Sequence, residues 1–139
     1  MHTLPTVPAD VTVHRDLAYV PGGHARQTLD IYLPAGAGAW PVIVYIHGGA
    51  FRMGSKADRV PLAMLAHGYA IVSINYRLSQ HAIFPAQITD CKAAVRWVRA
   101  HADTYHLNAD HIIAWGESAG GHLASMLGAV SYTHLRAHE

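Results

Sequence analysis

Short apolar segments alternate with helix-forming segments along this chain, and the alternation limits the folds that it can adopt. Residues 42–46 form an uninterrupted and largely β-branched run, which is typical of a strand covered on both faces. Residues 69–74 and 112–115 are further apolar runs that we expect to be buried strands. Between them, residues 86–102 carry apolar side chains at helical spacing. Strands separated by crossover helices predict a mostly parallel sheet in an α/β fold.

Two more strands are expected near the amino-terminal end, over residues 11–20 and 28–33, joined by a Pro-Gly-Gly turn. In the second of these, aliphatic residues alternate with Asp30 and Tyr32, which predicts a strand with one half-exposed face. A short helix is expected over residues 58–67.

The last elements surround the strand at residues 112–115. An Asn-Ala-Asp sequence at residues 108–110 predicts a turn into that strand. Apolar residues at helical spacing then predict a helix over residues 119–129. We find no internal repeat and no linker, so the chain is one domain or part of one.

The composition agrees with a folded domain and argues against several functions. The chain is 51% hydrophobic and 14% charged, which is too apolar for a disordered protein. Lys and Arg number 10 against 9 Asp and Glu, so no basic surface predicts a nucleic-acid partner. The single cysteine, Cys91, excludes an internal disulfide. Because we see neither a signal peptide nor an apolar run near the roughly 18 residues of a membrane span, we expect a cytoplasmic protein without a membrane partner. The oligomeric state is not predicted.

A candidate nucleophile lies in residues 116–120, which have the pattern G-x-S-x-G directly after the strand at residues 112–115. A tight strand-to-helix turn strains the backbone of Ser118 and lifts its hydroxyl above the sheet. Glycines two positions either side remove the Cβ atoms that would collide there. The N–H groups at the start of the following helix favour developing negative charge. The alternative is a simple helix N-cap serine between turn glycines.

A second loop with suitable chemistry, residues 47–51 (His-Gly-Gly-Ala-Phe), follows the strand at residues 42–46. Gly48 and Gly49 let the backbone turn its N–H groups toward a pocket without a side chain in the way. Such donors stabilise the tetrahedral oxyanion formed when a serine attacks an ester, by about 3 kcal/mol each. An ordinary Gly-Gly turn is the alternative. Both loops follow parallel strands, so we expect them at the same carboxyl edge of the sheet, where open α/β sheets bind ligands.

These two motifs occur together with three further segments, at residues 75–79 (Asn-Tyr-Arg-Leu-Ser), 84–87 (Phe-Pro-Ala-Gln) with Asp90, and 96–99 (Arg-Trp-Val-Arg). In this combination the sequence resembles the hormone-sensitive-lipase-like esterases, and more closely the bacterial feruloyl- and acetyl-esterase-like branch of the α/β-hydrolases. The resemblance covers roughly residues 11–129. It implies an α/β-hydrolase fold and a serine carboxylesterase that acts on small esters, with no cofactor and no metal.

Carried over residue by residue, the resemblance implies that Ser118 is the nucleophile. It implies an oxyanion hole made of three backbone N–H groups, those of Gly48, Gly49 and Ala119. It gives His47 the role of supporting the oxyanion loop rather than transferring protons. It also implies a structural polar cluster of Tyr76, Arg77 and Asp90. The family often has a third glycine where this chain has Ala50, and this departure leaves the two donors of the loop intact.

The rest of a catalytic triad is missing from the sequence. In α/β-hydrolases an acid and then a histidine follow the serine, but the only acid after Ser118 is Glu139. His122 lies on the helix that Ser118 opens, and we expect it to be structural. The apolar pattern ends before residues 130–139, which resemble a translated sequencing adapter. We therefore expect residues 1–129 to be the amino-terminal part of one α/β-hydrolase domain, truncated after the helix that follows the elbow. We expect residues 130–139 to be a non-native tail.

Three functions remain open on the sequence. The first is a carboxylic ester hydrolase that acts by serine acyl transfer with a backbone oxyanion hole; the fragment itself is expected to be inactive. The second is a small-molecule binding protein on the same fold that lacks a complete triad. The third is a peptidase on the same scaffold. An Asp and a His further along the gene would separate the first function from the second.

Overall fold

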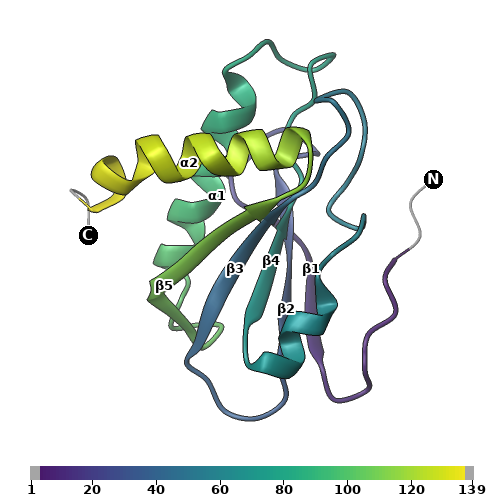
Figure 1. Ribbon diagram of the computed structural model, residues 1–139, viewed down its shortest axis with the longest axis vertical. Helices are drawn as coiled ribbons and strands as arrows, with labels where there is room; N and C mark the ends of the chain where they lie inside the picture. Colours follow the sequence, from purple (N-terminus) through teal and green to yellow (C-terminus); the bar gives the residue numbers. More distant parts are fainter. Residues whose placement is uncertain (1–3, 137–139) are drawn as a thin grey trace.

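The computed structural model describes residues 4–136, with side chains described up to residue 127. Five strands form a single mixed sheet, with α1 and α2 on one face and the 3-10 helix η1 on the other (Figure 1). The elements are, in chain order, β1 (Thr12–Ala18), β2 (Thr28–Leu33), β3 (Trp40–Ile46), η1 (Leu62–His67), β4 (Ala70–Ile74), α1 (Ala86–Ala100), β5 (Leu107–Gly116) and α2 (Ala119–Arg136).

The strand order across the sheet is β1-β2-β4-β3-β5. β3 pairs in parallel with β4 and with β5, while β2 is antiparallel to β1 and to β4. The crossover segments therefore bring the carboxyl ends of β3, β4 and β5 to one edge. This arrangement confirms the predicted α/β class with parallel strands around β3.

The sheet has an apolar layer on each face. In one layer, α1 and α2 pack against alternate residues of β2, β3 and β4. This layer includes Val44 of β3, Val72 of β4 and Val95 of α1. The other layer lies under η1 and contains Tyr45 and Leu65. β3 is buried on both sides, as its continuous apolar sequence predicts.

β2 differs from the half-exposed strand that its alternating sequence predicted. Asp30 and Tyr32 are both fully buried. Tyr32 belongs to the apolar layer under η1, and the Asp30 carboxylate lies 2.9 Å from Lys56 Nζ and 3.2 Å from Arg15 Nη1. These partners allow a carboxylate to be buried, because each charge is matched by an opposite charge and a hydrogen bond.

The short helix is also shorter than predicted. Residues 55–58 form a turn in which the Ser55 N–H donates to the Asp58 carboxylate at 2.8 Å. Arg59 then has a φ of 50°, a left-handed conformation that cannot continue into a right-handed helix. η1 therefore begins only after Pro61, and it ends as predicted at Gly68, which has a φ of 83°.

β5 begins earlier than predicted, and the expected turn is found inside it. The pairing register between β3 and β5 shifts between the Trp40 pair and the Val42 pair. At this irregularity the Asp110 N–H donates to Asn108 Oδ1 at 3.0 Å, as in an Asx turn.

α2 extends through Arg136, beyond the predicted end at residue 129. The domain limits expected at residues 1–129 and 130–139 stay a prediction. In the part of the chain that the structure describes, we find no helix with the length and apolar character that crossing a membrane requires.

Candidate active site

Ser118 lies in the sharp connection between β5, which ends at Gly116, and α2, which begins at Ala119. Its φ is 54°, in the left-handed region that disfavours side chains with a Cβ. The Ser118 carbonyl already accepts the first helical hydrogen bond, from the His122 N–H at 3.1 Å. An ordinary N-cap residue has an extended backbone, so the left-handed φ of Ser118 favours a strained elbow over a simple cap.

The two glycines of the elbow are required by close backbone packing. A Cβ at Gly116 would overlap the Gly120 carbonyl, and a Cβ at Gly120 would overlap the Ile46 carbonyl. The second contact ties the start of α2 to the end of β3. Ser118 is therefore held at the carboxyl edge of the parallel strands, beside the loop that follows β3.

The structure brings this loop into contact with the elbow. A Cβ built at Gly48 would lie 2.7 Å from the Glu117 carbonyl oxygen and 3.2 Å from Ser118 Cβ. A side chain at position 48 would thus occupy the space beside the serine. The predicted nucleophile and the predicted oxyanion loop, which are far apart in sequence, are neighbours in the fold.

The backbone of this loop is unusual over several residues. Gly49 has a φ of 128°, followed by Ala50 at 55° and Phe51 at 62°. The Gly49 carbonyl accepts the N–H groups of Arg52 at 2.9 Å and Met53 at 3.1 Å, which closes the loop into a tight turn. Glycine adopts the left-handed conformation seen at Ala50 more readily than alanine does. This accounts for the glycine often found at this position in the family that the sequence resembles.

His47 is buried next to this loop and contacts it. Its side chain is 1% exposed, and its ring stacks on Tyr76 with a centroid distance of 4.3 Å. Nδ1 lies 2.7 Å from the Gly48 carbonyl oxygen, and Nε2 lies 3.0 Å from Arg26 Nη2. Since both ring nitrogens are engaged, His47 has no nitrogen left to take a proton from Ser118.

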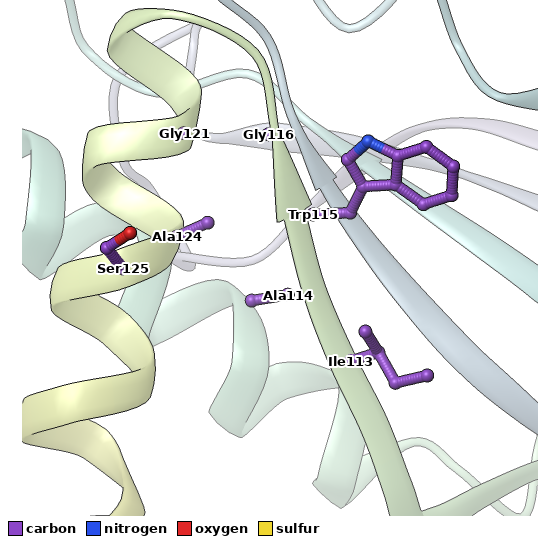
Figure 2. Close-up of a pocket in the computed structure, with 7 residues that line it drawn as sticks. All are labelled: Ile113, Ala114, Trp115, Gly116, Gly121, Ala124 and Ser125. Atoms are coloured by element: carbon purple, nitrogen blue, oxygen red, sulfur yellow. The ribbon is translucent and has the colours of Figure 1, made fainter.

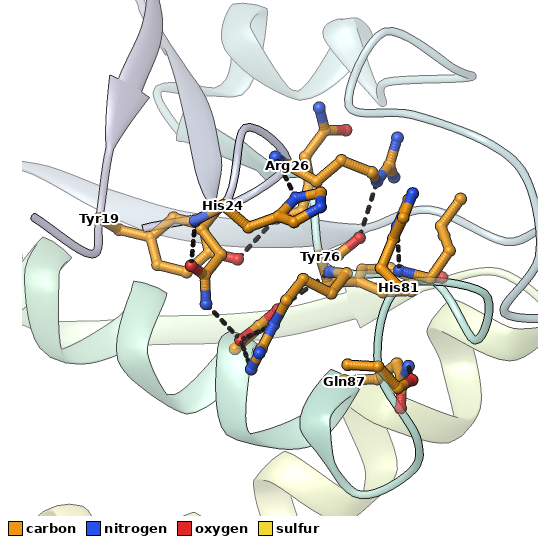
Figure 3. Close-up of polar contacts among 12 residues, drawn as sticks. Tyr19, His24, Arg26, Tyr76, His81 and Gln87 are labelled. Atoms are coloured by element: carbon orange, nitrogen blue, oxygen red, sulfur yellow. Dashed lines mark hydrogen bonds and ion pairs between the residues drawn. The ribbon is translucent and has the colours of Figure 1, made fainter. Parts of the chain in front are cut away.

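A buried polar cluster adjoins His47, and Figure 3 shows several of its members, among them Arg26 and Tyr76. The Tyr76 hydroxyl donates to the His47 carbonyl at 2.8 Å. The Asp90 carboxylate accepts hydrogen bonds from Arg77 Nη2 at 2.8 Å and from Gln27 Nε2 at 2.9 Å. The hydrogen bond with Asp90 raises the pKa of the Arg77 guanidinium, and burial raises the pKa of the Tyr76 hydroxyl. These groups join the oxyanion loop to α1 and to the turn before β2.

Two members of this cluster, Arg26 and Gln27, were not singled out in the sequence. They lie in a polar turn before β2, and no local motif marks them. Only the pairing of β2 with β4 brings them to the loop that follows β3.

Two further questions near the elbow are the role of His122 and whether side chains could bind a metal ion. His122 is exposed on α2, with its ring centroid 6.2 Å from that of Phe51. Among the residues that the structure describes, no group of three or more His, Cys, Asp or Glu side chains is arranged to hold a metal ion.

A pocket of about 490 Å³ lies between β5 and α2 (Figure 2). It is lined by Ile113, Ala114, Trp115, Gly116, Gly121, Ala124 and Ser125. Gly116 of the elbow lines this pocket, but Ser118 does not.

Comparison with known proteins gives a consistent result. The sequence model of the BD-FAE family matches residues 29–137. Esterase LipQ of Mycobacterium tuberculosis is 39% identical over 118 residues, which cover 80% of this chain and 28% of LipQ.

Two solved structures are similar in fold as well as in sequence. A truncated form of a carbohydrate esterase from gut microbiota superposes with a TM-score of 0.81 at 36% identity, covering 88% of this chain and 45% of that one. Esterase B from Lactobacillus rhamnosis, in a structure described as inhibited by a tributyrin phosphonate, superposes with a TM-score of 0.78 at 31% identity, covering 88% and 41%.

The chain spans about a quarter to a third of the length of the curated relatives that it matches. The family match nevertheless includes β2 to β5, the loop after β3 and the elbow at Ser118. The chain therefore belongs to the BD-FAE family of the α/β-hydrolase superfamily.

Proposed function

We propose that the complete protein hydrolyses small carboxylic esters by serine acyl transfer, with Ser118 as the nucleophile. The observation that carries the proposal is the contact between Gly48 and the strained elbow of Ser118. Acyl transfer needs a serine nucleophile and fixed N–H donors close to the same carbonyl group of the ester, and the closeness of the two segments supports this assignment. The names of the relatives, which include esterases and carboxylic ester hydrolases, agree with this chemistry.

In the proposed reaction, Ser118 Oγ attacks the carbonyl carbon of the ester while a histidine takes its proton. The carbonyl oxygen becomes an oxyanion, which is stabilised by backbone N–H groups of Gly48, Gly49 and Ala119. The intermediate collapses, and the alcohol leaves with the proton from the histidine. Water then attacks the acyl-serine by the same route, releasing the carboxylic acid and restoring the serine.

We assign the proton-accepting histidine and its acid to residues outside this chain. His47 is excluded because Arg26 and Gly48 engage its two ring nitrogens. His122 is exposed on the helix that starts at the elbow and runs away from it. In α/β-hydrolases both partners follow the serine in sequence, in the order acid and then histidine.

Ser118→Ala tests the proposal in the complete protein, with p-nitrophenyl acetate as the substrate. We expect kcat to fall at least about a thousandfold, because the covalent intermediate can no longer form. Ser125→Ala is the matched control, since Ser125 is exposed on the same helix, and its kcat should stay within about twofold of the wild type. Full turnover in Ser118→Ala would exclude serine acyl transfer at this position.

The alternative is a protein that binds small molecules without hydrolysing them. It predicts saturable binding of a small ester, no turnover by the wild type, and no effect of Ser118→Ala on turnover. A cytoplasmic location and the absence of nucleic-acid partners stay predictions from the sequence.

A further inference from the structure

Arg26 reaches the back of the oxyanion loop from the turn before β2. Its Nε donates to the Tyr76 carbonyl at 2.8 Å (Figure 3). Its Nη2 lies 3.0 Å from His47 Nε2. Its own N–H is bound as well, to His24 Nδ1 at 3.0 Å. Arg26 is therefore fixed at three points, two of them on the guanidinium, and Nη2 of its planar fork faces the His47 ring.

The partners of His47 fix its protonation. A guanidinium can only donate, so Nε2 must carry the lone pair that faces Arg26. A carbonyl oxygen can only accept, so Nδ1 must carry the hydrogen that faces Gly48 O. The ring is thus neutral with its hydrogen on Nδ1, and it donates to the Gly48 carbonyl at 2.7 Å.

This hydrogen bond controls the orientation of one peptide unit. The Gly48 carbonyl and the Gly49 N–H belong to the same planar trans peptide, so they point in opposite directions. Holding the carbonyl toward His47 aims the Gly49 N–H away from it, out of the protein core. Two consecutive glycines oppose a peptide flip only weakly, so the direction of this N–H depends on a partner for the carbonyl.

We propose that Arg26 is a positioning residue for ester hydrolysis: through His47 it holds the Gly48–Gly49 peptide with the Gly49 N–H directed into the oxyanion hole. The proposal rests on the proposed function, because it assumes that this N–H stabilises an oxyanion at Ser118. Arg26 itself does not contact the substrate. Its effect passes through the hydrogen position on the His47 ring, which can be observed without any activity measurement.

The first experiment measures that ring directly. In the complete protein, ¹⁵N NMR of labelled histidine should show a neutral His47 ring with its hydrogen on Nδ1, the signal being assigned by its loss in His47→Asn. In Arg26→Met the ring should shift toward the tautomer with its hydrogen on Nε2, which is the common form when no partner imposes the other. A wild-type ring with its hydrogen on Nε2 would overturn the proposal, and this ring state is read in the wild-type protein itself.

The second experiment measures hydrolysis of p-nitrophenyl acetate. Arg26→Met should lower kcat about tenfold to a hundredfold and leave KM within about threefold, since a misplaced oxyanion donor weakens the transition state more than substrate binding. The kcat of Arg26→Lys should lie between those of the wild type and Arg26→Met. One ammonium group cannot bind both the Tyr76 carbonyl and His47 Nε2 with the geometry of a guanidinium.

Arg15→Met is the matched control. This variant also removes a guanidinium, but Arg15 lies on β1 and forms its ion pair with Asp30, at 3.2 Å. It should lower the melting temperature while leaving the ring state and kcat unchanged. If Arg26→Met lowers only the melting temperature, as the control does, the positioning role is wrong while the nucleophile assignment stands. If Ser118→Ala retains full activity, the proposed function fails, and the proposal that depends on it fails with it.

Discussion

Gly120 and Gly121 are adjacent residues in the first turn of α2, yet only one of them has room for a side chain. A Cβ at Gly120 would overlap the Ile46 carbonyl, whereas the nearest atom to a Cβ at Gly121 is the Gly116 carbonyl oxygen at 3.3 Å. We expect Gly120→Ala to destabilise the protein by about 2–3 kcal/mol, because α2 must move away from β3. Gly121→Ala should stay within about 0.5 kcal/mol of the wild type, since the gain in helix propensity offsets the tighter contact.

Urea unfolding of both variants measures this difference. The two substitutions change helix propensity by the same amount, so the difference between them isolates the contact between the elbow and β3. Equal stabilities for the two variants would show that the start of α2 is not packed against Ile46 as described.

At the scale of single residues, the sequence identifies the site residues that belong to a local motif. Ser118 and Gly48 stand out because the strained turn and the oxyanion loop each require particular residue types within a few positions. Arg26 does not stand out, since its contact with His47 depends on the pairing of β2 with β4. Likewise, the burial of Asp30 could not be read from its strand, because Lys56 comes from a separate loop.

At the scale of the elements, the burial of β3 on both faces can be tested by the pH dependence of stability. Burial raises the pKa of the Tyr45 hydroxyl to about 12, from an ordinary value near 10. The folded protein therefore resists ionisation of Tyr45 more than the unfolded chain does. Stability is unaffected below about pH 10 and falls as the pH rises from about 10 to 12, by about 2 kcal/mol for this one group.

We expect Tyr45→Phe to reduce the loss of stability between pH 8 and pH 11, measured by urea unfolding. Tyr69→Phe serves as the control, because its side chain lies nearer the surface. The loss should be reduced only in part, since Tyr19 and Tyr76 are shifted in the same direction by burial. An unchanged pH dependence in Tyr45→Phe would contradict this assignment.

The elements themselves were predicted well where periodicity is strong. β3 and α1 are found within two residues of their predicted limits, because burial on both faces and helical spacing leave clear patterns. The predicted helix at residues 58–67 was too long because the left-handed backbone of Arg59 has no signature in residue type. The start of β5 was missed because its Asx turn occurs inside a paired strand.

Across the whole molecule, β5 is an edge strand in the described sheet, with β3 as its neighbour. Its outward side chains include Ile113, 47% exposed, and Trp115, 39% exposed. An apolar edge with free backbone groups is a template for pairing with another chain. We therefore expect the isolated 139-residue chain to self-associate or to be insoluble.

Size-exclusion chromatography of charged variants tests this expectation. Ile113→Lys should shift the chain toward the monomer, because a lysine on the edge opposes strand pairing. Ile83→Lys is the matched control, since Ile83 is 84% exposed in a loop away from β5, and it should leave the elution unchanged. A monomeric wild-type chain with a sharp cooperative melt would contradict the prediction.

The isolated chain should also hydrolyse p-nitrophenyl acetate at a rate close to the uncatalysed background. Without a histidine and an acid to activate Ser118, only binding and the oxyanion donors remain to accelerate the reaction. Steady-state assays of the wild-type chain and of Ser118→Ala should therefore agree. Robust turnover that disappears in Ser118→Ala would show that this chain contains a working triad.

The most direct test of the account asks which atom of the complete protein takes up the acyl group. An aryl phosphonate ester mimics the tetrahedral intermediate and remains bound to a serine nucleophile. After treatment, peptide mapping by mass spectrometry should find one adduct, on Ser118, and ester hydrolysis should be lost in proportion to its formation. Continued loss of activity with the adduct on another residue, or full activity with Ser118 modified, would contradict the assignment of Ser118 as the nucleophile.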